Sequence, residues 1–107
     1  RTAPIQPADY QGVFPVPPLA RSSRTREIDW AQNDKVAAHI TGAGITRLMY
    51  GGNAFLYHIT LAEYEPLLDW LSQQPDTVWC IPSAGPSYGR LIDQAAILKR
   101  YNFPAVM

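Results

Sequence analysis

Apolar residues recur along the chain with two different spacings, which predict strands and helices in alternation. The central run is Ile45–Tyr50, an apolar stretch that stops at the Gly51-Gly52 pair. An apolar run that ends in two glycines is typical of a buried strand followed by a tight turn. Glycine also lets a ligand approach the backbone closely, and Asn53 adds a side-chain amide at the same turn. The loop after this strand is therefore the first place to look for chemistry.

A first helix is predicted just before this strand. Asp29 is a candidate N-cap, and Gln32 stands three residues further on, as in a capping box. Gly42 and Gly44 end the helix, as glycines after a helix commonly do. The apolar positions that share one helical face are Val36, Ala37 and Ile40.

Two more helices are predicted further along the chain. The segment 60–63 is a capping box, with Thr60 at the cap and Glu63 three residues on. Pro66 should either bend this helix or mark a later start, nearer Glu65. Ser87 is a candidate cap for the last helix. The apolar faces are Leu61, Tyr64, Leu67, Leu68 and Leu71 in one helix and Leu91, Ala95 and Leu98 in the other.

Three further apolar segments are predicted to be strands, which makes the order βαβαβαβ. Strands that alternate with helices favour a parallel sheet with right-handed crossovers. The loops that follow strands are longer than those that follow helices, and ligand sites in α/β folds collect at that carboxyl end. A Rossmann unit and a P-loop are disfavoured because their glycine motifs are missing. The three segments are 12–16, 77–81 and 103–107.

Composition narrows the class of protein. The chain of 107 residues has zero net charge, so neither nucleic acid nor an anionic membrane is an expected partner. No apolar run approaches the ~20 residues that span a bilayer. The one cysteine, Cys80, excludes an internal disulfide and fits a reducing, cytoplasmic compartment. We expect Cys80 to be an inert core residue.

Prolines set the character of the N-terminal segment. Five of the ten prolines lie in the first eighteen residues, so residues 1–11 are expected to be an extended arm rather than a helix. Residues 12–107 then form part of one domain. The chain starts with Arg1 and stops at Met107 inside an apolar run, which suggests two cuts in a longer protein. Arg21, Arg24 and Arg26 are interpreted as a solvated loop, with an anion site as the alternative.

Other chemistry-bearing residues favour packing or surface roles. No second ligand recurs at metal spacing near His39, so no metal site is expected. His58 precedes the helix at Thr60 and is interpreted as packing there, with a substrate contact as the alternative. The tryptophans are interpreted as packing residues rather than ligand contacts; they are Trp30, Trp70 and Trp79.

Four short runs of the chain form a set: Gly12-Val-Phe-Pro-Val-Pro-Pro-Leu19, Gly42-Ala-Gly-Ile45, Tyr50-Gly-Gly-Asn-Ala-Phe55 and Thr60-Leu-Ala-Glu-Tyr64. Together these runs resemble the start of the dihydrodipicolinate synthase / N-acetylneuraminate lyase family. The similarity extends from Gly12 onward and rests on the order and spacing of short runs. The resemblance implies a (β/α)₈ barrel, of which this chain is about the first three βα units and the start of the fourth strand.

The family implies a lyase or aldolase that joins pyruvate, or a related 2-keto acid, to a lysine as a Schiff base. No diffusible cofactor is implied, and the parent is expected to be a homo-oligomer, a tetramer or dimer. The family's Schiff-base lysine and its catalytic tyrosine are expected beyond Met107, so this chain alone should be inactive. Lys35 and Lys99 fall on outward-facing helices and are not candidates for that role.

The resemblance also suggests which residues hold the substrate. The family's Gly-Thr-Thr-Gly-Glu loop corresponds to residues 51–55, where Gly52 and Asn53 replace the two threonines. Gly52, through its N–H, and Asn53, through its amide, are the expected ligands of the keto acid's carboxylate. Ser83 is a further candidate, although loop serines often bond their own backbone. Loss of the threonine pair motivates the alternative, a non-catalytic relative that binds a keto acid or sugar acid as a sensor.

Overall fold

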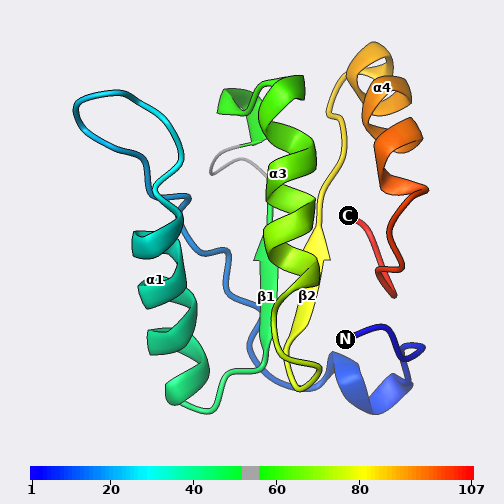
Figure 1. The fold of residues 1–107 in the computed structure, drawn as a ribbon. Helices are drawn as coiled ribbons and strands as arrows, with labels where there is room; N and C mark the ends of the chain where they lie inside the picture. Colours follow the sequence, from blue (N-terminus) through cyan, green and yellow to red (C-terminus); the bar gives the residue numbers. More distant parts are fainter. Residues whose placement is uncertain (52–55) are drawn as a thin grey trace.

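The computed structural model describes residues 1–51 and 56–107 as a small α/β domain (Figure 1). Three α-helices and two strands form the regular structure of these residues, with two short 3-10 helices. The strands and α-helices alternate in the chain, as the sequence predicts. In order, the elements are η1 Pro7–Tyr10, α1 Trp30–Gly42, β1 Arg47–Tyr50, η2 Leu56–His58, α3 Leu61–Ser72, β2 Trp79–Pro82 and α4 Tyr88–Leu98.

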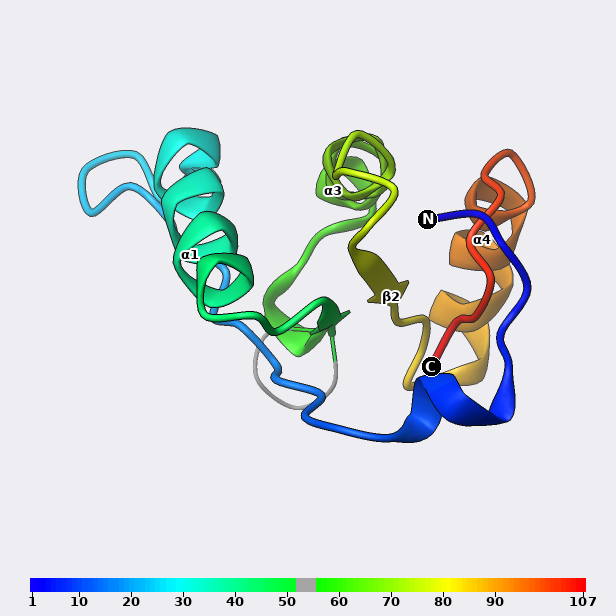
Figure 2. The same cartoon turned by 90° about the horizontal axis from the view of Figure 1, so that it is seen from below.

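The sheet consists of β1 and β2, which pair in parallel with Arg47 opposite Trp79 and Tyr50 opposite Pro82. Helix α3 lies between the two strands in the chain and crosses over from one to the other, which is the βαβ unit the sequence predicts. Figure 2 shows the three α-helices on one side of the sheet, while the N-terminal segment runs past the other side. None of the helices described is long and apolar enough to cross a membrane.

The predicted outer strands, 12–16 and 103–107, are not strands in the part of the chain described. The first makes one ladder-like bond, in which the Met49 N–H donates to the Pro15 carbonyl at 3.0 Å. The second makes two such bonds: the Met107 N–H donates to the Pro82 carbonyl, and the Met107 carbonyl accepts from the Ala84 N–H. Proline has no N–H to donate, so Pro15 in the first segment and Pro104 in the second each remove a possible ladder hydrogen bond.

Side-chain caps start the α-helices where the sequence predicts. Asp29 accepts a hydrogen bond from the Gln32 N–H at the start of α1, and the Ser87 hydroxyl accepts from the Arg90 N–H at the start of α4. The full capping box of Thr60 is present at the start of α3. The alternative start of this helix near Glu65 is therefore wrong, and Pro66 lies inside the helix.

The core lies between the helices and the sheet. Side chains alternate along β1, so Leu48 and Tyr50 are buried while their neighbours are partly exposed. From α3, the predicted face contributes every residue except Leu61, whose exposed fraction is 46%. The other members of the core are Ala37, Leu56, Ile59, Tyr64, Leu67, Leu68, Trp70, Leu71, Val78 and Cys80.

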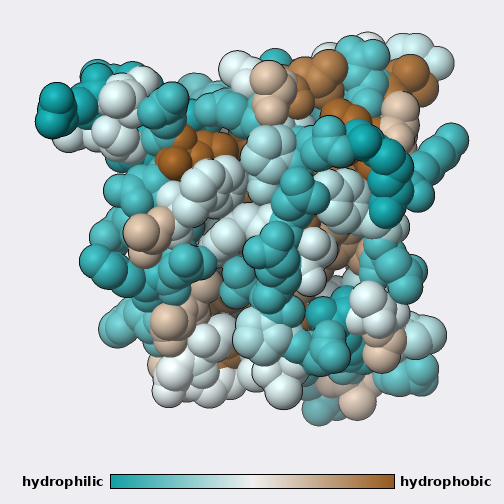
Figure 3. Space-filling model, in the orientation of Figure 1, coloured by the Kyte–Doolittle hydropathy of each residue, from teal (hydrophilic) through white to brown (hydrophobic). Residues whose placement is uncertain are grey.

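Two residues expected in the core are exposed instead. Leu61 and Leu91 lie near the starts of α3 and α4, which extend past the tips of the strands in Figure 1. Neither strand of the described residues reaches beneath them. Figure 3 shows the resulting hydrophobic surface over the starts of these two helices.

The end of the N-terminal arm and the residues just after it, 9–14, pack against the face of the sheet that the helices leave uncovered. The Tyr10 and Phe14 rings meet Trp79 edge to face, with centroids 6.2 and 5.7 Å away. Arg47 stacks on Phe14 and donates from Nε to the Asp9 carbonyl. The arm differs from the expected extended form because it contains the 3-10 helix η1. Proline is tolerated at the first position of this helix, since the first N–H of a helix makes no hydrogen bond within it.

We predict that Leu68→Ala lowers the free energy of unfolding by about 2–5 kcal/mol, because it leaves a cavity in the core. Leu61→Ala is the matched control on the same helix and should change the free energy of unfolding by less than about 1 kcal/mol. Urea denaturation of both variants measures the difference. Equal losses would contradict the burial of Leu68 and the exposure of Leu61.

Candidate functional site

Gly51 and Ser83 meet at the carboxyl end of the sheet. Each follows the last residue of its strand, and those last residues, Tyr50 and Pro82, are opposite each other. Gly51 has a φ of +139°, and a Cβ added to it would lie 2.1 Å from the Ser83 Oγ. Glycine is therefore required here both by the backbone conformation and by the contact with Ser83.

The hydroxyl of Ser83 is buried without a hydrogen-bond partner among the residues described. The residue is 2% exposed, and its carbonyl accepts a 2.8 Å hydrogen bond from the Tyr64 hydroxyl. Burial raises the pKa of Tyr64, which keeps this phenol protonated and able to donate. A buried hydroxyl without a partner is uncommon in folded proteins, so Ser83 is a candidate contact for a bound polar group.

The three predicted site residues have different outcomes. Gly52 and Asn53 lie outside the described residues, so their placement stays a prediction. Ser83 is described, and it lies at the carboxyl end of β2, directly beside the glycine that precedes the predicted pair.

Gln94 supports the Ser83 loop and was missed by the sequence reasoning. Its side chain is buried, with 1% exposed, and its Oε1 accepts a 2.7 Å hydrogen bond from the Gly85 N–H. A signal was available, since Gln94 is three residues after Leu91 and four before Leu98 and so shares their predicted apolar face. A polar residue on such a face indicates a buried hydrogen bond.

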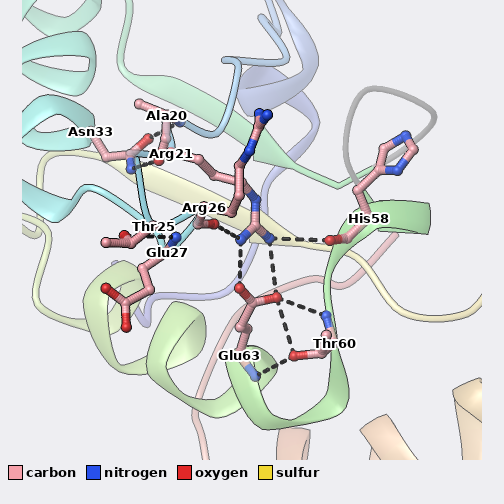
Figure 4. A network of polar contacts seen from close by, with 9 residues as sticks. All are labelled: Ala20, Arg21, Thr25, Arg26, Glu27, Asn33, His58, Thr60 and Glu63. Carbon is pink, nitrogen blue, oxygen red and sulfur yellow. Dashed lines mark hydrogen bonds and ion pairs between the residues drawn. The ribbon is translucent and has the colours of Figure 1, made fainter. Parts of the chain in front are cut away.

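A second polar group holds the loop after residue 20 against the start of α3 (Figure 4). The guanidinium of Arg21 makes two contacts with the Glu63 carboxylate, at 2.5 and 3.0 Å. It also donates to the carbonyls of Arg26 and His58, at 2.8 and 3.1 Å. The Arg21 side chain therefore binds groups of the protein itself. It is neither the solvated side chain nor the anion ligand that the sequence analysis considered.

Glu63 is the centre of this group of contacts. Its carboxylate pairs with Arg21 and also accepts from the Thr60 N–H and hydroxyl. The Arg21 contact, together with those from Thr60, lowers the pKa of Glu63 to about 2 despite some burial. One carboxylate thus caps α3 and anchors the loop, which is a structural task.

The other chemistry-bearing residues of the sequence analysis lie at the surface or are packed inside the fold. Lys35 and Lys99 are exposed on or next to outward-facing helices. Burial raises the pKa of the Cys80 thiol to about 11, so little thiolate forms near neutral pH. Trp70 packs near Trp30 and donates to Asp34 at 2.7 Å. Within 1–51 and 56–107, no group of three His, Cys, Asp or Glu gathers as metal ligands.

The fold and this site define the class of protein as a small α/β domain with a parallel sheet and polar loops at its carboxyl end. The comparisons add no closer assignment: no family model matches the chain, and neither the curated proteins nor the solved structures gave a match.

We predict that Gly51→Ala lowers the free energy of unfolding by about 2–4 kcal/mol, through backbone strain and overlap with Ser83. Gly89→Ala is the matched control, because this helical glycine has open space where a Cβ would lie. It should raise stability by about 0.5–1 kcal/mol. Chemical denaturation of both variants checks the pair, and a neutral Gly51→Ala would show that the two strand ends do not touch.

We also predict an acid-dependent contribution from Glu63. Its pKa is about 2 in the folded chain and 4.5 ordinarily, so the carboxylate stabilises the fold fully above about pH 4.5. That contribution falls as the pH drops from 4.5 toward 2. Thermal melts should therefore show the stability difference between the native chain and Glu63→Gln shrinking over this window. A difference that does not change with pH would contradict the role of the ion pair.

Proposed function

We propose that this chain is part of a (β/α)₈ barrel enzyme, a Schiff-base-forming lyase that acts on pyruvate or a related 2-keto acid. The carrying observation is the pairing of Gly51 with Ser83, which puts a glycine turn and a buried hydroxyl side by side at the carboxyl end of parallel strands. In barrels of this class, catalytic and binding groups stand at that end.

The arrangement of the elements supports the barrel. Strands β1 and β2 are consecutive in the chain and adjacent in the sheet, and residues 15 and 107 make hydrogen bonds at its two outer edges. All three α-helices lie on one side (Figure 2). Consecutive parallel strands with their helices outside are the repeating unit of a (β/α)₈ barrel, and a whole barrel needs ~250 residues. The rest of the barrel would come from a longer protein.

The proposed chemistry divides into binding and covalent steps. Gly52 and Asn53 would donate hydrogen bonds to the keto acid's carboxylate, and Ser83 would donate to the substrate from the neighbouring loop. A lysine outside this chain would form the Schiff base, in which its nitrogen replaces the keto oxygen and water leaves. The exposed Lys35 and Lys99 take no part.

The test is an intact mass measured before and after treatment with pyruvate and borohydride. The longer protein that carries this chain is expected to gain a reduced pyruvate adduct, and the 107-residue chain is expected to gain none. If the longer protein binds pyruvate but forms no adduct, the result would favour the alternative, a non-catalytic relative that binds a keto acid or sugar acid as a sensor. Neither binding nor an adduct, with a panel of 2-keto acids, would overturn the proposal.

A substitution at Ser83 tests the binding role in that longer protein. Ser83→Ala should weaken keto-acid binding by about 0.5–1.5 kcal/mol, the net value of one hydrogen bond. Without ligand it should leave stability unchanged or raise it, since it removes a buried hydroxyl that has no partner among the described residues. Ser23→Ala, in the exposed loop, is the control and should change neither quantity. Unchanged affinity in Ser83→Ala would remove this residue from the site.

A further inference from the structure

A hollow of about 410 Å³ lies on the outer surface, between the start of α1 and the start of α3. Neither Gly51 nor Ser83 lines it, and it plays no part in the proposed function. Figure 3 shows hydrophobic surface where the adjoining loop meets the top of α1. Its volume falls in the range of small-molecule sites. The lining residues are Glu27, Ile28, Trp30, Ala62, Glu63 and Pro66.

Apolar groups form much of the wall. Ile28 and Trp30 come from the loop and the first residue of α1, and Pro66 comes from the opposite helix. All three are at least partly accessible. An aliphatic chain gains from contact with such a wall, and an aromatic ring also attracts a cation that lies against its face.

Acceptor groups are present in the wall. Glu27 and Glu63 each bring a carboxylate. Pro66 has no N–H, so the Ala62 carbonyl lacks the donor that a helix normally provides four residues later. Ala62 and Pro66 both line the hollow. An ammonium group, with three N–H donors and no acceptor, complements these groups.

The charges also favour a cation. Glu63 is balanced by Arg21, whereas Glu27 has no ion pair or side-chain hydrogen bond among the residues described. No Lys, Arg or His lines the hollow. Figure 4 shows the Arg26 side chain pointing away from both carboxylates. The starts of the two helices already have carboxylates, Asp29 for α1 and Glu63 for α3, which offset their positive ends.

We propose that this hollow binds a small alkylammonium ion. The ammonium donates to the Glu27 carboxylate and the Ala62 carbonyl, and its aliphatic chain lies against Ile28, Trp30 and Pro66. Free amino acids are poor ligands, because their own carboxylate would be repelled by the unpaired carboxylate of Glu27.

The test is an NMR titration of the 107-residue chain with n-butylammonium chloride at constant ionic strength. The amide signals of residues 27–30 and 62–66 and the Trp30 indole signal should shift together and saturate. 1-Butanol, which has the same aliphatic chain without the charge, should bind more weakly. Shifts spread over the whole surface, or equal binding of the alcohol, would overturn the proposal.

Glu27→Gln removes the unpaired carboxylate from an exposed residue, so the fold should be kept. It should raise the dissociation constant by about threefold or more, as expected for a partly exposed ion pair. Glu65→Gln removes a carboxylate from α3 outside the hollow and should leave the affinity unchanged. Equal effects of the two variants would mean only non-specific attraction of the cation to a negative surface.

Pro66→Ala tests the carbonyl separately. It supplies the missing N–H, which pairs with Ala62 inside the helix, so the ammonium should bind about twofold more weakly while α3 becomes more stable. Affinity that stays the same would remove the carbonyl from the site. A lysine-rich peptide that binds when butylammonium does not would overturn the small-ligand site and indicate a protein-docking surface instead.

Discussion

The parallel pairing of β1 with β2 is the constraint on which the rest of the structure depends. Parallel neighbours need a connection that returns along the sheet, and α3 provides it. The same pairing aligns the two strand ends, so the residues after them must share a small space. Glycine at position 51 makes that possible, and the buried Ser83 hydroxyl occupies the space that a side chain would have taken.

Helix α3 is tied to its surroundings at both ends and along its buried face. At its start, Glu63 connects it to the loop through Arg21. In its middle, the Tyr64 hydroxyl holds the Ser83 carbonyl, and later the Asp69 carboxylate accepts from the Tyr101 hydroxyl beyond α4. This helix therefore links the candidate site to the outer surface. A shift of α3 would therefore displace both the Ser83 loop and the wall of the hollow beside α1.

The sequence predicts the local features of this fold well, because caps depend on a few neighbouring residues. Asp29, Thr60 and Ser87 each start a helix as expected. The outer strands were predicted less well, because a ladder needs a partner and free N–H groups that sequence periodicity does not report. The exposure of Leu61 depends on how far α3 extends past the sheet, which is a tertiary property. For the candidate site, Ser83 lies in the loop after β2, as the sequence predicts. Its binding role stays a prediction, as do Gly52, Asn53 and the family resemblance.

The arm and the residues just after it cover Trp79, and this has a consequence for the order of folding. Phe14 and Tyr10 lie far from Trp79 in the chain, and their contacts close a long loop. The surface they pack on exists once β1 and β2 have paired, because Arg47 and Trp79 belong to different strands. The arm should therefore dock late, over a sheet that is already formed. Its detachment would open one face of the sheet to solvent while the helices on the other face stayed in place.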